Sequence, residues 1–178
     1  ADAQAFLDLS LLNYMPGMKD NPSDPVNACK FMLYQDPLVQ LFEADTQGYA
    51  MARHFGSLVT RYARYAVENP EYGLLFDFYT ALANALALKC VWHEQAGEAV
   101  RSRNREQAAA LADGIPATVE ALNTLRVVWR KLWETTNKPN GFEIIEVRLG
   151  GVAARMTTAG EKMRAFALGE TETIPELE

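Results

Sequence analysis

The last part of the chain carries the pattern that most constrains its fold. Between Ile145 and Phe166, apolar side chains alternate four and three residues apart for about three heptads. A seam of this kind packs along another helix at a shallow crossing angle. Gly169 stands where a glycine commonly ends a helix. The pattern therefore predicts a long C-terminal helix that is one member of a bundle.

Helical periodicity also dominates the middle of the chain. We expect further helices that cover residues 49–69, begin near Glu71, run from Asn104 to Gly114, and begin at Pro116. The helix that begins near Glu71 has almost no charged residue before Lys89, so we expect it to be the most buried. No segment shows the sustained β-branched alternation of a strand, and no repeat is present. The sequence predicts an all-α fold, a bundle of four to five helices.

The first part of the chain has a different character. Residues 1–47 contain a short helical stretch over 6–14 and then the turn-forming pairs Pro16-Gly17, Asn21-Pro22 and Asp24-Pro25. We expect this segment to be irregular and to wrap over a surface. Residues 48–178 are expected to form the bundle, with the whole chain making one domain.

Charge and composition exclude several classes of partner. The net charge of −6 leaves no concentrated basic surface, which argues against nucleic acid. No uninterrupted apolar run approaches the roughly 20 residues that span a bilayer, so we expect no membrane partner. Cys29 and Cys90 lie in apolar surroundings and read as buried thiols of a reducing compartment. The expected location is the cytoplasm.

The residues that usually carry chemistry do not form a recognisable catalytic motif. The only histidines, His54 and His93, have no acidic residue three positions earlier, unlike the pairs of di-iron bundles. Cys90 and a partly exposed His93 lie one helical turn apart, but zinc needs three or four ligands. Asp36, Glu43 and Asp45 have the positions of ordinary capping residues. We therefore expect no catalytic residue, no metal and no cofactor in this chain.

Two adjacent glycines interrupt the strongest helix of the sequence. Gly150 and Gly151 cost about 1 kcal/mol each relative to alanine, so we expect another backbone or a large group to approach that turn closely. Arg148 and Arg155 lie seven residues apart on the side of Gly151. They are expected to form ion pairs with a neighbouring helix or with a missing domain, and direct contact with a ligand is the alternative.

Three blocks of sequence resemble a known family. The first spans residues 27–38 and reads Asn-Ala-Cys-Lys-Phe-Met-Leu-Tyr-Gln-Asp-Pro-Leu. The second comprises Trp129, Trp133, the segment 137–143, the Arg-Leu-Gly-Gly segment 148–151 and Arg155, and the third is the ending 174–178. In this order they are similar to the helical C-terminal domain of a bacterial subgroup of family 20 glycoside hydrolases, the β-N-acetylhexosaminidases.

The resemblance implies a non-catalytic accessory domain. The parent enzyme would remove terminal N-acetylhexosamine from glycans by substrate-assisted hydrolysis, with the catalytic Asp-Glu pair in an upstream barrel. This chain alone would be inactive and would cover one side of the barrel, and a homodimer stays open as a further arrangement. The residues expected to face the barrel or a dimer partner are Arg148, Gly150, Gly151, Arg155, Trp129 and Trp133. The alternative is an autonomous interaction module that docks a partner helix along the Ile145 to Phe166 seam.

Overall fold

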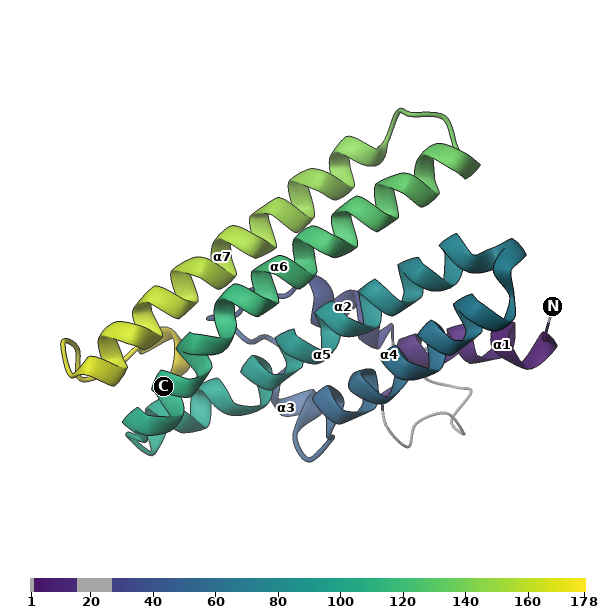
Figure 1. The fold of residues 1–178 in the computed structure, drawn as a ribbon. Helices are drawn as coiled ribbons and strands as arrows, with labels where there is room; N and C mark the ends of the chain where they lie inside the picture. Colours follow the sequence, from purple (N-terminus) through teal and green to yellow (C-terminus); the bar gives the residue numbers. More distant parts are fainter. Residues whose placement is uncertain (1, 16–26) are drawn as a thin grey trace.

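The computed structural model describes residues 2–15 and 27–178 of the chain, and these residues form an all-α domain (Figure 1). Four long helices make the bundle, and three short α-helices and three 3-10 turns accompany them. The α-helices are α1 (Ala3–Asp8), α2 (Ala28–Tyr34), α3 (Glu43–Thr46), α4 (Met51–Glu68), α5 (Gly73–Arg101), α6 (Arg105–Thr136) and α7 (Phe142–Leu168). The 3-10 turns are η1 (Leu9–Asn13), η2 (Pro70–Tyr72) and η3 (Pro175–Leu177). The predicted fold class is confirmed.

Each long helix packs mainly against the helix that precedes or follows it in the chain. Short turns connect them, so neighbouring helices run antiparallel and α6 and α7 form a long hairpin (Figure 1). The predicted seam faces α6, and its members Leu149, Met156, Met163 and Phe166 are at most 1% exposed. Gly169 closes α7 in a left-handed conformation with φ of 78°, as the sequence predicted.

The seam is consequently unavailable to a partner. The autonomous-module alternative required a free apolar stripe between Ile145 and Phe166, but α6 already covers that stripe. Gly160 marks a close approach of the two helices, because a Cβ there would lie 2.8 Å from Cγ1 of Ile115 on α6. Docking of a foreign helix on the seam would require the hairpin to open.

The expected break between Gly114 and Pro116 is wrong. Helix α6 continues through both residues from Arg105 to Thr136. An interior proline removes one backbone hydrogen bond and costs about 3 kcal/mol. Burial of Leu111, Ile115 and Leu122 along one continuous stripe outweighs that cost. The predicted cap at the start of this helix is confirmed, since the Asn104 side chain accepts a hydrogen bond from the N–H of Gln107 at 3.0 Å.

The core helix is α5, which lies between α4 and α6 and carries more buried residues than any other described helix. By length and composition alone, the helical segment Pro70–Arg101 would also pass as a membrane span. Its apolar side chains are instead used inside the bundle, where Phe76, Leu86, Cys90 and Ala96 are completely buried. The expected burial of this helix is thus observed.

The N-terminal part is more helical than its turn-forming pairs indicated. Helix α1 and η1 cover the predicted short helical stretch, and α2 and α3 lie in the part expected to be irregular. Asp8 ties α1 to α4, because its carboxylate accepts a hydrogen bond from the Tyr65 hydroxyl at 2.7 Å and pairs with Arg61 at 3.1 Å. The turn-forming pairs between Pro16 and Pro25 lie outside the described residues. Helix α2 packs on α5 and α7, as a wrapping segment should.

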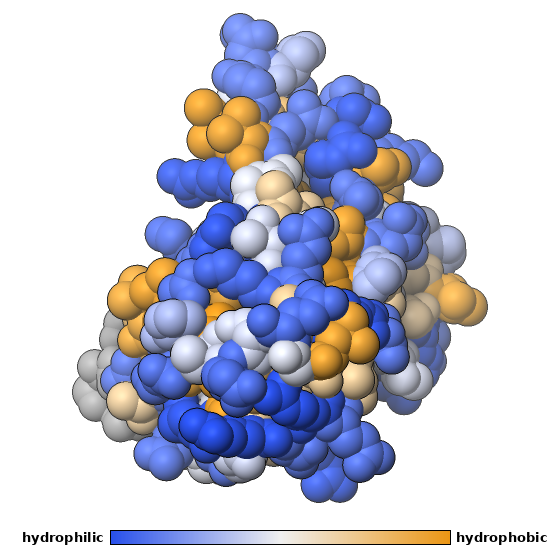
Figure 2. Space-filling model, turned by 90° about the vertical axis from the view of Figure 1, so that its left-hand side faces the viewer, coloured by the Kyte–Doolittle hydropathy of each residue, from blue (hydrophilic) through white to orange (hydrophobic). Residues whose placement is uncertain are grey.

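The surface differs from one region to another. At the end of the bundle where α7 finishes and α6 begins, hydrophilic residues predominate and apolar residues form scattered patches (Figure 2). Beside α2 the picture is different, since Phe31, Val39 and Leu41 are 38%, 54% and 72% exposed within eleven positions of the chain. Such a concentration of exposed apolar side chains is typical of a binding or interaction surface, so α2 and its neighbours are the candidate region.

Candidate functional site

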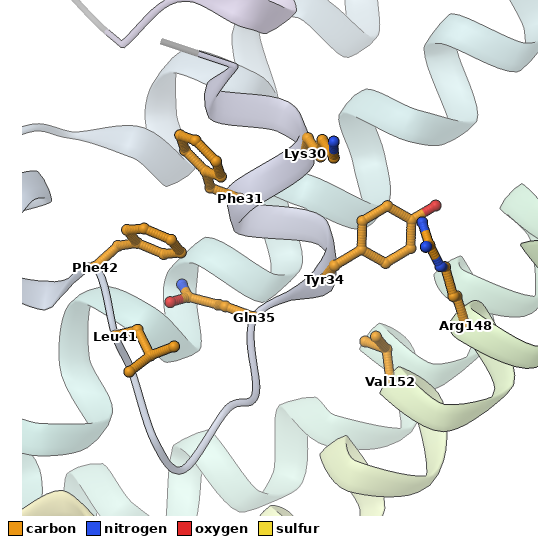
Figure 3. A pocket seen from close by; sticks show the side chains of 8 residues that line it. All are labelled: Lys30, Phe31, Tyr34, Gln35, Leu41, Phe42, Arg148 and Val152. Atoms are coloured by element: carbon orange, nitrogen blue, oxygen red, sulfur yellow. The ribbon is translucent and has the colours of Figure 1, made fainter.

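A pocket of about 410 Å³ opens between α2, the loop that follows it, and α7. Figure 3 shows its lining side chains, which come from α2 (Lys30, Phe31, Tyr34), from the loop that follows it (Gln35, Leu41, Phe42) and from α7 (Arg148, Val152). The walls are mainly apolar and aromatic. Phe31 and Phe42 stack with ring centroids 4.8 Å apart, and the Arg148 guanidinium lies 5.7 Å from the centre of the Tyr34 ring.

The loop on one side of the pocket is held by buried side chains of α5. The Lys89 ammonium donates to the carbonyls of Leu33 at 2.8 Å and of Gln35 at 2.9 Å, and the Trp92 indole donates to the Pro37 carbonyl at 2.8 Å. Burial lowers the pKa of Lys89 to about 8. Side chains of α5 therefore donate hydrogen bonds to three backbone carbonyls, and these bonds fix where the chain turns after α2.

A second polar contact determines the orientation of Gln35. The Thr46 hydroxyl donates to the Phe42 carbonyl at 2.7 Å, so its oxygen accepts from Nε2 of His93 at 2.6 Å. The other ring nitrogen of His93 must then accept from the Gln35 amide nitrogen, 3.0 Å away. Burial lowers the pKa of His93, in agreement with a neutral ring that has one donor and one acceptor.

This arrangement leaves one strong acceptor without a donor. The Gln35 side chain is more than nine-tenths buried, and its Oε1 has no hydrogen-bond partner among the described residues. The amide lies between Phe42 and Leu41 at the pocket (Figure 3). In this tautomer the amide nitrogen, and not the oxygen, faces the His93 ring; the other tautomer, with Thr46 donating to Nε2, would reverse the amide. An unsatisfied buried acceptor costs about 1–3 kcal/mol, and a bound donor would recover that free energy.

Arg155 fixes the same loop from the side of α7. Its guanidinium contacts the Asp36 carboxylate twice, at 2.5 and 3.2 Å, so one of the six predicted interface residues is engaged within the domain. Asp36 also accepts from the backbone N–H groups of Leu38 and Val39. The Arg155 hydrogen bond, with help from these backbone groups, holds the pKa of Asp36 below its usual value although burial opposes the shift. Asp36 therefore caps the turn after α2, which agrees with the ordinary capping role expected from the sequence.

Arg148, Gly150 and Gly151 occupy the open side of α7. All three are exposed, and no heavy atom of a packed neighbour lies within 4 Å of the position a Cβ would take at either glycine. Nothing in the described chain explains the two glycines, so the close approach predicted there is not made within this domain. Arg148 has no ion-pair partner among the described residues, and the contact that it makes there is with the Tyr34 ring.

Trp129 and Trp133 are placed at the far end of the hairpin. Both rings contact Phe142, with centroids 6.4 and 6.0 Å apart, and Trp129 also lies 5.1 Å from Phe78. The Trp133 indole donates to the Lys138 carbonyl at 2.8 Å. These two predicted interface residues thus join α6 to the start of α7 and to α5, and both remain partly exposed.

The described residues offer binding groups near the pocket but no assembled catalytic centre. Across residues 2–15 and 27–178, no three His, Cys, Asp or Glu side chains are grouped to hold a metal ion. His93 is 7% exposed, so the expectation of a partly exposed imidazole beside Cys90 is wrong. What the site presents is an apolar cavity, an unsatisfied amide oxygen and cationic groups at its rim.

Comparison with known families decides what kind of domain this is. Residues 4–178 match the family described as Glycoside Hydrolase 20C C-terminal domain. The chain belongs to this family. It is the non-catalytic accessory domain of a family 20 hexosaminidase, a larger enzyme with its catalytic domain upstream. No curated protein matches the chain.

Sequence reasoning located the family but missed most of the pocket. Gln35, Lys89 and His93 were not predicted to act together, because their polar contacts join positions 54 to 58 residues apart. One signal was present: a lysine and a histidine on the apolar face of the most buried helix must find polar partners there. The sequence could not identify which carbonyls and amides those partners are.

Proposed function

We propose that this domain stabilises the hexosaminidase by docking against its catalytic domain through one surface, the α2/α7 face. That face comprises Lys30, Phe31, Tyr34, Leu41, Phe42, Ile144, Arg148 and Gly151. The observation that carries the proposal is Gly151, a glycine inside α7 on this face that no packed part of the described chain touches. Gly56 and Gly114 are open in the same way, so Gly151 is distinguished by its place beside the exposed apolar groups of α2 and its loop. Glycine in a helix interior is costly, and a close neighbour from outside the domain would supply the reason for it at this place.

Helical spacing supports a single continuous face. Ile144, Arg148, Gly151 and Arg155 are separated by four, three and four residues, which places them along one side of α7. Arg148 contacts Tyr34 and Arg155 pairs with Asp36, so this side of α7 borders α2 and its loop. Exposed aromatic and aliphatic groups beside arginine are typical of interfaces between proteins or domains.

The decisive test is made in the full-length hexosaminidase with Gly151→Gln and the matched variant Gly114→Gln. Gly114 on α6 is also helical and exposed, and no packed neighbour lies within 4 Å of the position that a Cβ would take there. We expect Gly151→Gln to lower the Tm of the enzyme, since a bulky side chain would separate two docked surfaces. Gly114→Gln should leave the Tm unchanged or raise it, because glutamine favours helix.

The opposite ranking would place the interface on the α6 side and refute the proposal. Light scattering on the same samples tests the homodimer: a fall in mass without a change in Tm would show that the face joins two copies. Hydrolysis of a chromogenic N-acetylglucosaminide measures function. We expect activity in the full-length enzyme and none in this chain alone; turnover by this chain would require a catalytic group that the proposal does not contain.

We also propose that the enzyme works in the cytoplasm. Cys29 and Cys90 are free thiols, and burial raises the pKa of Cys29 to about 11. Unpaired thiols are typical of a reducing compartment. Fractionation of the source cells, with hexosaminidase activity as the marker, tests this location, and activity in the medium or envelope would contradict it.

A further inference from the structure

We infer that the pocket of the α2/α7 face holds an apolar side chain from the catalytic domain of the same polypeptide, beside a carboxylate that pairs with Lys30 and Arg148. This inference rests on the proposed docking face and adds the chemistry of the docked segment. Three features of the pocket define that chemistry: its apolar walls, its unsatisfied acceptor and its unpaired cations.

The walls select an apolar group. Phe31 and Phe42 stack on one another at one side of the cavity, and Leu41 projects beside them with 72% of its surface exposed (Figure 3). Val152 lies at the α7 side. Removing such surface from water stabilises a docked apolar side chain.

The acceptor selects a segment that also carries a donor. Gln35 Oε1 is buried and unsatisfied when the amide nitrogen donates to His93. Because this atom has almost no accessible surface, a backbone N–H or a hydroxyl of the docked segment would satisfy it only after Leu41 or Phe42 moved aside. A purely hydrocarbon ligand would leave this oxygen without a partner, which favours a piece of polypeptide.

The rim selects a negative charge. Lys30 and Arg148 both line the pocket, and neither has a carboxylate within ion-pair distance among the residues described. Most other arginines near a packed surface are paired, as Arg101 is with Glu43 and Arg126 is with Glu146. Two unpaired cations on a chain with a net charge of −6 fit an acidic residue of the docked segment.

The catalytic domain of the same chain is the occupant to which we commit. It is covalently joined to this domain in the hexosaminidase, so docking is intramolecular and benefits from a high effective concentration. A second copy of the enzyme or a free sugar would have to compete with that linked segment. Both alternatives become outcomes of the experiment below.

The experiment is zero-length carbodiimide crosslinking of the full-length hexosaminidase, mixed from ¹⁴N and ¹⁵N preparations and mapped by mass spectrometry. Carbodiimide joins an amine to a carboxylate only when the two are in contact. Lys162 and Glu176, which form an ion pair in this domain, supply the internal positive control. We expect Lys30 to be joined to an Asp or Glu of the catalytic domain, with both peptides carrying the same isotope.

Matched variants test the apolar part of the inference. Leu41→Ser should abolish the Lys30 crosslink, whereas Leu168→Ser should leave it unchanged, since Leu168 is similarly exposed at 67% on the distant end of α7. Equal crosslinking in both variants would show that Leu41 does not contact the occupant and would overturn the inference. Because both leucines project into solvent, neither change disturbs the core of the domain.

Each remaining result has a defined meaning. Mixed-isotope Lys30 crosslinks would assign the pocket to a second copy, and the absence of any Lys30 crosslink beside an intact Lys162–Glu176 crosslink would also overturn the inference. So would protection of Lys30 from acylation by added N-acetylglucosamine, which would assign the pocket to sugar. If Gly151→Gln still lowers the Tm alongside any of these three results, the docking face stands and only its proposed occupant fails. If Gly151→Gln does not lower the Tm, both proposals fail.

Discussion

Two glycine sites on α7 differ in what surrounds them. At Gly160 a Cβ would lie 2.8 Å from Ile115, whereas Gly150 and Gly151 have no packed neighbour within 4 Å of that position. All three are helical and carry the same cost in helix propensity. At Gly160 the close packing of α6 accounts for the cost, and at the other two positions nothing in the described chain does. The comparison shows that α7 is packed against α6 on one side, whereas its opposite side, at Gly150 and Gly151, has no packed neighbour within the described chain.

The largest loss of stability should come from a substitution on the side of α7 that packs against α6. Met156 is completely buried at the centre of the α6/α7 contact, so Met156→Ala should lower the free energy of unfolding by about 3 kcal/mol through lost burial and an unfilled cavity. Urea unfolding followed by circular dichroism measures it. The exposed neighbour Thr157 provides the control, and Thr157→Ala should change stability by no more than about 0.5 kcal/mol. Equal losses in both variants would mean that the hairpin does not pack as described.

The next effect tests the close approach itself. Gly160→Ala should destabilise the domain by about 1 kcal/mol, because overpacking costs about 1–3 kcal/mol and the gain in helix propensity offsets part of it. The Ile115 side chain is branched next to the backbone and cannot move aside at low cost. In a double-mutant cycle with Ile115→Ala, the substitution at Gly160 should become neutral or stabilising. Additive effects would show that the contact with Ile115 is not the cause.

On the open side of α7, replacing a glycine by alanine should stabilise the domain and not destabilise it. Gly151→Ala should stabilise this isolated chain by about 1 kcal/mol, since alanine favours helix and meets no neighbour. A gain of that size corresponds to a rise in Tm of about 2–4 °C for a domain near this size. Gly114→Ala provides the reference for an exposed helical glycine. A loss of stability at Gly151 alone would reveal a contact inside the domain and would weaken the argument for an external one.

The same contrast explains what the sequence could predict. Periodicity identified α7, its partner-facing seam and its terminal glycine, because each depends on residues within one or two turns of each other. It also marked Gly150 and Gly151 as exceptional. It did not mark Gly160, although this glycine lies four residues after Met156 on the buried side of the helix.

The candidate site was predicted only in part, for a related reason. Of the six expected interface residues, Arg148, Gly150 and Gly151 lie open to solvent, while Arg155 is paired with Asp36. Whether all six meet another domain stays a prediction. Asp36 and Arg155 are 119 positions apart, and no local pattern indicates a pairing over that distance. The sequence also divided α6 into two helices for this reason: burial in the bundle outweighs the local helix-breaking signal of Pro116, and a local pattern does not show that burial.

The smallest effect concerns the ion pair that borders the open side. Asp36→Asn should lower stability at neutral pH by about 0.2–1 kcal/mol, the range for a partly exposed pair. Because the pKa of Asp36 is lower in the folded state, its contribution to stability is complete above the ordinary carboxyl pKa of about 3.9 and is lost as the pH falls through the lowered value. The stabilities of wild type and variant, measured by urea unfolding from pH 7 to 2.5, should therefore converge at the acid end. A difference that persists unchanged to pH 2.5 would mean that the charge of Asp36 is not what stabilises the loop beside the α2/α7 face, since asparagine keeps an acceptor for the N–H groups of Leu38 and Val39.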